Sequence, residues 1–185
     1  MRMIFPEKTL LLKDGREAIL RAPNPEKGAE AMVQYLKTTA GETNFLLREV
    51  EECEIPVERE RVFLQEKVDS GTAAMIVCEV EGELAGLCSL DRKTLLRTRH
   101  RATVGVALKS RYWGLGIGTA MLHELIEQAQ KAGVSRLELE YIEGNERARG
   151  LYEKMGFHVT GERPDAIRLR DGTSLKEISM VKRLE

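Results

Sequence analysis

The chain has 185 residues, of which 42% are hydrophobic and 32% are charged. This length and composition fit one globular domain with a substantial apolar core, so we expect residues 1–185 to form a single domain. The 29 basic and 30 acidic side chains leave a formal net charge of -1. The chain as a whole therefore has no general attraction to nucleic acid or to anionic lipid, and any anion site must be local.

Cysteine usage and the apolar runs indicate the compartment. Cys53, Cys78 and Cys88 have neither the spacing of a metal site nor the even number of a disulfide framework, and the three histidines are scattered. We expect reduced, buried thiols, no metal site and a cytoplasmic location. The N-terminal apolar run is too short for a signal peptide, and no apolar stretch reaches the length of a membrane span.

Hairpins and helices alternate along the first half of the chain. Asp14–Gly15 between two apolar runs is typical of a hairpin turn. Pro25 suits the first turn of a helix, with Asn24 as its N-cap. We expect, in order, strands at residues 9–13 and 17–21, helices at residues 25–41 and after residue 56, and strands at residues 72–80, 84–91 and 102–108.

The second half contains one strand–helix–strand crossover. Residues 117–133 carry apolar side chains at helical spacing, and Gly133 is a good C-cap. Asn145 and Gly156 are placed to begin and end a short helix. Further strands are expected at residues 135–142, 157–162 and 175–184, the last two joined by a turn near residues 171–172. Because most strands are joined by tight turns, we expect an α/β fold with a mixed, largely antiparallel sheet flanked by helices.

Three glycines alternate with aliphatic residues in R-Y-W-G-L-G-I-G, residues 111–118, between a strand and a helix. The first turn of a helix has backbone N–H groups without intrahelical partners, and the helix dipole adds partial positive charge there. Gly114, Gly116 and Gly118 would let an anion reach these groups without meeting a Cβ. Arg111, with Lys109 nearby, would supply a cation. The loop therefore predicts a diphosphate site; the alternatives are a tight packing turn and, with poorer spacing, a dinucleotide fingerprint.

A second motif, N-E-R-A-R-G-L-Y-E-K-M-G-F, follows at residues 145–157. Together the two motifs resemble those of the GNAT superfamily of N-acetyltransferases, which use acetyl-CoA. The family's R-x-x-G-x-G/A motif is matched by Arg111, Gly114 and Gly116, and its later motif by Asn145, Ala148, Leu151, Tyr152, Gly156 and Phe157. The resemblance is firm over residues 102–157 and implies a GNAT-like twisted sheet in which a splayed central strand pair holds the cofactor.

The resemblance also implies roles for individual residues. Backbone N–H groups of residues 114–119 would hold the diphosphate of coenzyme A, and the strand at residues 106–108 would offer main-chain groups to the pantetheine arm, one of them as an oxyanion donor. Tyr152 occupies the general-acid position, and a phenol suits protonation of a departing thiolate. The expected cofactor-binding residues are Val106, Ala107, Leu108, Arg111, Trp113, Gly114, Leu115, Gly116, Ile117, Gly118, Thr119, Asn145, Ala148, Tyr152 and Lys154.

The general base departs from the family pattern. The usual strand glutamate, two residues ahead of a glycine, is here Thr103, ahead of Gly105, and a threonine cannot act as a base at neutral pH. Glu140 and Glu143, at the end of the neighbouring strand, are substitutes by location, and a chain of water molecules could also relay the proton. We take Glu140 as the candidate base.

The acceptor is the least determined part of the interpretation. Glutamates are dense in residues 42–61, which indicates either attraction to a cationic amine or a solvated face balanced by neighbouring arginines. The basic loop at residues 92–101 lacks aromatic residues, so we expect no nucleic-acid partner. The expected activity is transfer of an acetyl group from acetyl-CoA to a primary amine of a small molecule, by direct attack in a ternary complex. A protein N-terminus or lysine as acceptor, and a non-catalytic acyl-CoA-binding sensor, are the alternatives; the chain could be a monomer or a homodimer.

Overall fold

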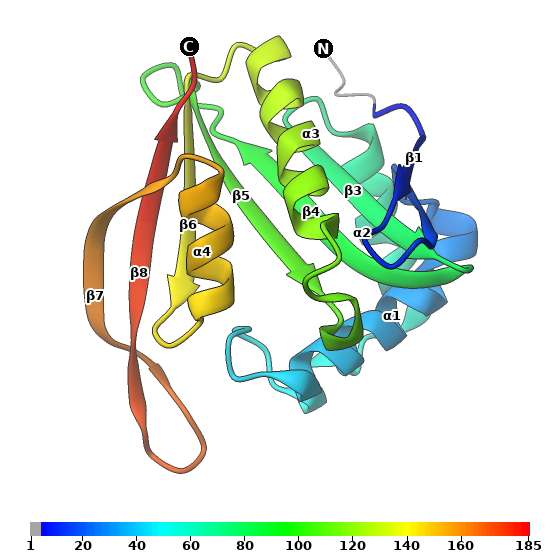
Figure 1. Cartoon of the computed structure of the whole chain (residues 1–185), viewed down its shortest axis with the longest axis horizontal. Helices are drawn as coiled ribbons and strands as arrows, with labels where there is room; N and C mark the ends of the chain where they lie inside the picture. The colour runs from blue at the N-terminus through cyan, green and yellow to red at the C-terminus, as the bar shows by residue number, and fades with distance from the viewer. Residues whose placement is uncertain (1–4) are drawn as a thin grey trace.

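The computed structural model describes residues 5–185, so the first four residues of the expected domain lie outside the described part. Figure 1 shows one sheet with helices on both of its faces. The strands are β1 (Lys8–Leu11), β2 (Glu17–Arg21), β3 (Ala73–Val80), β4 (Glu83–Arg92), β5 (Arg101–Leu108), β6 (Arg136–Ile142), β7 (His158–Arg168) and β8 (Ser174–Arg183). The helices are α1 (Pro25–Glu42), α2 (Val57–Asp69), α3 (Ile117–Lys131) and α4 (Glu146–Lys154), with short 3-10 turns η1 (Val50–Cys53) and η2 (Ser110–Tyr112).

The sheet has the order β1-β2-β3-β4-β5-β6-β8-β7. Every neighbouring pair is antiparallel except β5 and β6, which are parallel and connected through α3. This confirms the predicted mixed, largely antiparallel sheet flanked by helices. The single parallel pair forms at the one crossover in the chain, since two parallel neighbours cannot be joined by a tight turn.

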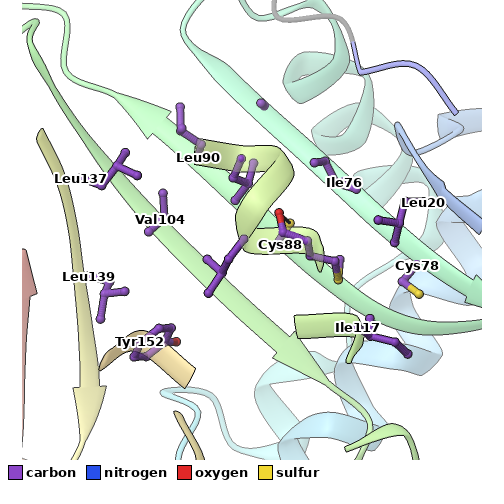
Figure 2. Packing of buried hydrophobic residues seen from close by; sticks show 14 of the residues in the cluster. Leu20, Ile76, Cys78, Cys88, Leu90, Val104, Ile117, Leu137, Leu139 and Tyr152 are labelled. Atoms are coloured by element: carbon purple, nitrogen blue, oxygen red, sulfur yellow. Dashed lines mark hydrogen bonds between the residues drawn. The ribbon is translucent and has the colours of Figure 1, made fainter. Parts of the chain in front are cut away.

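Two apolar layers enclose the sheet. On one face, α3 packs Ile117, Met121 and Leu125 against buried side chains of β3 to β6, among them Leu90 and Leu137 (Figure 2). On the other face, α1 and α2 cover only the half of the sheet that contains β3 and β4. Within residues 5–185, no helix lies over the β5–β6–β8 part of this second face (Figure 1).

The strands and helices confirm the predicted order, with differences at some ends. The first strand is Lys8–Leu11 rather than 9–13, because Leu12 already belongs to the turn, where its N–H bonds to the carbonyl of Arg16. The strand expected at residues 157–162 continues to Arg168, with irregular register between Arg163 and Ile167. Pro164 lies in that irregular part, where a missing N–H is tolerated. The three cysteines are free and buried, as predicted.

Candidate active site

The parallel strands β5 and β6 separate after a short contact. They pair only at Arg101↔Arg136, Ala102↔Leu137 and Thr103↔Glu138, although both strands continue for several residues beyond. Figure 1 shows the two strands diverging toward α4 and the loop before α3. The splayed central strand pair predicted from the resemblance is therefore present.

The splay leaves part of the β5 backbone without a strand partner. Lys109 donates to the carbonyl of Ala85, and Lys93 donates to the carbonyl of Arg101, so the odd-numbered residues of β5 use their backbone groups toward β4. The even-numbered residues Val106 and Leu108 consequently direct their N–H and C=O groups toward the gap. The Leu108 carbonyl accepts a hydrogen bond from the Trp113 indole at 2.9 Å. The Leu108 N–H and both backbone groups of Val106 face the gap.

A cavity of about 390 Å³ occupies this gap. Of the expected site residues, its lining includes Val106, Ala107, Leu108, Trp113, Glu140, Asn145, Ala148 and Tyr152. Sequence reasoning missed the remaining lining residues, which come from the end of α1, the loop after it, β4, β5, β6 and α4: Thr39, Thr43, Phe45, Leu46, Leu47, Leu87, Ser89, Gly105, Tyr141, Arg147 and Leu151. The cavity lining is mostly apolar, with a few polar groups that could orient a ligand.

The glycine loop lies beside this cavity without lining it. Gly114 and Gly116 have φ values of 78° and 98°, a left-handed conformation that side chains disfavour, and a Cβ at either glycine would meet nothing within 4 Å. Gly116 is the N-cap of α3, a helix of 15 residues, so the N–H groups of residues 117–119 have no partner within the helix. This arrangement fits a diphosphate.

Gly118 has a different reason to be glycine. It is buried, and a Cβ there would meet Leu151 Cδ2 at 3.0 Å and Leu108 Cδ1 at 3.6 Å. The missing side chain therefore allows α3 to pack closely against α4 and β5. The glycine spacing in the sequence did not distinguish this packing role from the conformational role of Gly114 and Gly116.

The cations near the loop are not where the sequence suggested. The side chains of Arg111 and Lys109 both form ion pairs with Glu83, and neither lines the cavity. Lys154, also outside the cavity lining, lies exposed on α4. The cation at the cavity is instead Arg147, whose guanidinium stacks 4.9 Å from the centroid of the Trp113 ring. Its place two residues after the N-cap Asn145 was the only signal in the sequence.

Tyr152 is held on α4 with its ring between two other aromatic rings. The ring centroids of Tyr141 and Phe157 lie 6.3 and 6.1 Å away. Burial raises the pKa of the Tyr152 phenol to about 12, so it holds its proton at neutral pH. Asn145 accepts a hydrogen bond from the Ala148 N–H at 3.1 Å, which confirms it as the cap of this helix. Figure 2 shows Tyr152 beside Leu139 of β6, at the wall of the gap.

The two candidate bases, and the threonine at the usual glutamate position, occupy different places. Glu140 lines the cavity, with Arg163 at 3.7 Å, and is the one carboxylate among its described lining residues. Glu143 turns away and accepts a hydrogen bond from the Lys176 N–H at 3.2 Å. Thr103 lies in a neighbouring groove on the open face of the sheet. The geometry thus brings Glu140, and not Glu143, together with Tyr152.

The loop between α1 and α2 closes one side of the cavity. Phe45 packs beside Gly144, where a Cβ would lie 3.7 Å from its ring. Arg170, at the turn between β7 and β8, forms ion pairs with Glu49 at 3.2 Å and Glu51 at 2.6 Å. The dense glutamates of this region thus find a partner far along the chain, in addition to the nearby arginines considered from the sequence.

The described residues lack two further features. Within residues 5–185, no group of three or more His, Cys, Asp or Glu side chains could hold a metal ion. No helix in that same stretch is long and apolar enough to cross a membrane.

Comparison with known proteins gives a consistent result. Residues 33–157 match the acetyltransferase (GNAT) family. The L-amino acid N-acetyltransferase AaaT of Escherichia coli is 26% identical over 58% of this chain and 67% of its own length. The [ribosomal protein bS18]-alanine N-acetyltransferase of Escherichia coli is 36% identical over 36% of this chain and 45% of its own length. The chain thus spans about half to two thirds of these relatives.

Solved structures show the same fold. An acetyltransferase of the GNAT family from Streptococcus pneumoniae superposes with a TM-score of 0.84 at 26% identity, covering 90% of this chain and 99% of that chain. An acetyltransferase from Salmonella typhimurium, solved with its cofactor acetyl-CoA, superposes with a TM-score of 0.78 at 18% identity, covering 91% and 94%. The fold is therefore shared over nearly the whole described chain.

Proposed function

This chain is a member of the acetyltransferase (GNAT) family, and we propose that it transfers the acetyl group of acetyl-CoA to a primary amine of a small molecule. The observation that carries the proposal is the splay of β5 from β6, which leaves backbone donors of β5 facing a cavity that Tyr152 and Glu140 also line. This combination provides for thioester binding, leaving-group protonation and proton removal within one space.

The cofactor assignment follows from the loop and the free strand edge. The N–H groups of residues 117–119 bind the diphosphate, and Arg147 adds a positive charge from α4. Val106 and Leu108 offer backbone groups to the amide-bearing pantetheine arm, as a strand would to a neighbour. Gly118 contributes by its close packing against Leu151, which holds the start of α3 next to α4.

When bound, acetyl-CoA supplies the acetyl group as a thioester. The attacking amine nitrogen forms a bond to the carbonyl carbon, and the bond from that carbon to sulfur breaks. A backbone N–H of β5 donates to the carbonyl oxygen, where negative charge develops. The Tyr152 hydroxyl donates its proton to the departing sulfur, and Glu140 accepts the proton lost by the amine. Each group acts within a single complex of the enzyme with both substrates.

The closed acceptor side supports a small molecule as the acceptor. Phe45 beside Gly144 joins the α1–α2 loop to the loop between β6 and α4, and the ion pairs of Arg170 with Glu49 and Glu51 join it to the turn between β7 and β8. These contacts lie across the place where a peptide would otherwise enter. A small amine needs no wider opening. The relative that is an L-amino acid N-acetyltransferase agrees with an acceptor of this size.

A protein N-terminus is the second candidate acceptor, because another relative is a ribosomal-protein alanine N-acetyltransferase. For this acceptor, the contacts of Arg170 with the α1–α2 loop would have to open. The ion pairs are exposed, with the Arg170 side chain 65% accessible, so opening costs little.

Release of coenzyme A thiol from acetyl-CoA tests the proposal directly. The assay compares small primary amines, amino acids, peptides with a free N-terminus and peptides with a single lysine, each with a blank lacking acceptor. We expect turnover with small amines and little with peptides. Turnover with N-terminal peptides alone would establish the second candidate. Binding of acetyl-CoA without turnover of any acceptor would instead indicate a sensor.

A further inference from the structure

A second hollow, which we call the open-face groove, adjoins the candidate active site. It has a volume of about 500 Å³ and lies over β5, β6 and β8 on the face that α1 and α2 leave uncovered. Glu140 lines both this groove and the cavity at the splay. Thr103 lines the groove, and Gly105, two residues further along β5, lines the cavity. The two hollows therefore meet beside the proposed base.

Strand alternation places one row of side chains along the groove. Leu137 and Leu139 of β6 point into the core beneath α3, so Arg136, Glu138 and Glu140 point to the opposite face. Arg101 on β5 lies directly beside Arg136 in the parallel register. The groove therefore has an arginine pair at one end and Glu140 at the other.

The remote end of the groove carries an excess of positive charge. The Glu138 carboxylate accepts hydrogen bonds from Nε and Nη2 of Arg101, each at 2.7 Å, and forms an ion pair with the Arg136 Nε at 2.7 Å. One carboxylate is therefore shared by two guanidinium groups. Lys93 adds a third cation, for which the described residues offer no ion-pair partner. Asp91 lies opposite Thr103 on β4, but its carboxylate is held by Lys67 of α2. Three cations and one carboxylate leave two positive charges at this end.

The end of the open-face groove beside the candidate active site carries a net negative charge. Arg163 lies 3.7 Å from Glu140 and in closer contact with Glu177, so two carboxylates share one guanidinium. The groove consequently has a negative end beside the reacting position and a positive end further from it. Arg136 and Glu140 are four residues apart on β6, which corresponds to about 13 Å between their Cα atoms.

From this polarity we infer that the acceptor carries an anionic group several bonds away from its reacting amine, with the amine at Glu140 and the anion at Arg101, Arg136 and Lys93. This inference rests on the proposed acetyl transfer and specifies its substrate class. Long arginine side chains shorten the span between the two ends. The remaining distance suits an ω-amino acid, the side-chain amine of free lysine or a two- to three-residue acidic segment, which extends about 7–10 Å. The amine and carboxylate of an α-amino acid are too close together to reach both ends.

A matched set of acceptors tests this inference. The rates of thiol release are compared for 6-aminohexanoate, for pentylamine, which keeps the five-carbon chain but has no carboxylate, and for glycine. We expect kcat/KM for 6-aminohexanoate to exceed that for pentylamine and that for glycine by at least about tenfold, because a charge-assisted hydrogen bond contributes on this scale. Equal values for 6-aminohexanoate and pentylamine would overturn the inference while leaving acetyl transfer itself intact.

Substitutions assign the effect to the groove. We expect Arg101→Gln and Arg136→Gln each to raise KM for 6-aminohexanoate about tenfold and to change KM for pentylamine less than twofold. Arg16→Gln is the matched control, because Arg16 is also in ion pairs, with Asp14 and Glu81, but at the turn between β1 and β2. Calorimetric binding of 6-acetamidohexanoate, the product, should weaken in parallel with KM in the two groove variants.

The outcomes separate the two proposals. Equal losses with 6-aminohexanoate and pentylamine in the groove variants would show that the arginines act only on structure, and would overturn the inference. Two variants on different strands guard against misfolding of either one. No thiol release with any amine would contradict the proposed function, and the substrate inference would fail with it.

Discussion

The two walls of the candidate active site are built in different ways. The proposed cofactor side consists mainly of backbone groups and glycines from one continuous stretch, from β5 through the glycine loop to the start of α3, with Arg147 added from α4. The acceptor side consists of side chains from segments far apart in sequence, such as Phe45, Glu140 and Arg170. Substitutions on the first side should therefore change acetyl-CoA binding, and those on the second should change only the use of the acceptor.

The largest effect is expected at Tyr152, where the two walls meet. Tyr152→Phe removes the proton donor but keeps the ring between Tyr141 and Phe157. We expect kcat to fall by at least about a hundredfold, as loss of a general acid does, with the acetyl-CoA dissociation constant changed less than threefold. Steady-state kinetics and calorimetry measure the two quantities.

Tyr112→Phe provides the control for this substitution. The Tyr112 hydroxyl donates to Glu83 at 3.1 Å, outside the cavity lining, so its loss should leave kcat close to that of the unchanged protein. A Tyr152→Phe variant with undiminished kcat would remove this tyrosine from the acid role.

The next largest effect tests the cofactor side alone. Gly116→Val places a branched side chain at a φ of 98° at the N-cap of α3 and in front of its free N–H groups. Backbone strain of about 1–3 kcal/mol together with the blocked approach should weaken acetyl-CoA binding by about a hundredfold. Gly161→Val, in strand β7, is the control, since a Cβ there meets nothing within 4 Å and its φ is not left-handed. Unchanged affinity in a folded Gly116→Val variant would contradict binding of the diphosphate at the glycine loop.

A smaller effect is expected on the acceptor side. Arg170→Gln removes the ion pairs that join the turn between β7 and β8 to Glu49 and Glu51. Because exposed ion pairs contribute little, KM for a small amine should rise only about two- to fivefold, and acetyl-CoA binding should not change. If the acetyl-CoA affinity fell as much as the acceptor affinity, the separation of the two walls would be wrong. An increase in activity toward N-terminal peptides would support the second candidate acceptor.

The smallest effect concerns pH. Burial raises the pKa of Tyr152 to about 12, above the ordinary value of about 10, so the phenol keeps its proton through pH 10. We therefore expect kcat, corrected for uncatalysed thioester loss, not to decline between pH 8 and pH 10. An ordinary tyrosine acting as the acid would lose half of its protonated form by pH 10. A decline with an apparent pKa near 10, absent from Tyr152→Phe, would contradict the buried environment described here.

The contrast between the two walls of the site also explains how much the sequence could predict. The order of elements, the cap at Asn145 and the glycine loop depend on neighbouring residues, and the sequence revealed them. The splay was expected only through the family resemblance, and the register of β5 and β6 bears it out. The sequence could not predict which cation faces the cavity. Arg111 forms an ion pair with Glu83, a residue 28 positions earlier in the chain, and so does not line the cavity.

Long-range contacts account for the other differences. The closure of the acceptor side depends on Arg170, more than a hundred residues after the glutamates that it contacts. The open-face groove requires β5, β6 and β8 to assemble before its charges become neighbours. Residue patterns within one segment carry no information about such pairings. For the same reason, the different surroundings of Glu140 and Glu143 become visible only once β6 is placed against β8.

Calorimetric titration of the full chain with acetyl-CoA, with NAD as the control, is the most direct test of the central claim that the splay and the glycine loop form a coenzyme A site. We predict one acetyl-CoA bound per chain with a dissociation constant in the micromolar range, and no heat of binding with NAD. No binding of acetyl-CoA, or equal binding of both nucleotides, would contradict the account and would reduce the glycine loop to a packing turn.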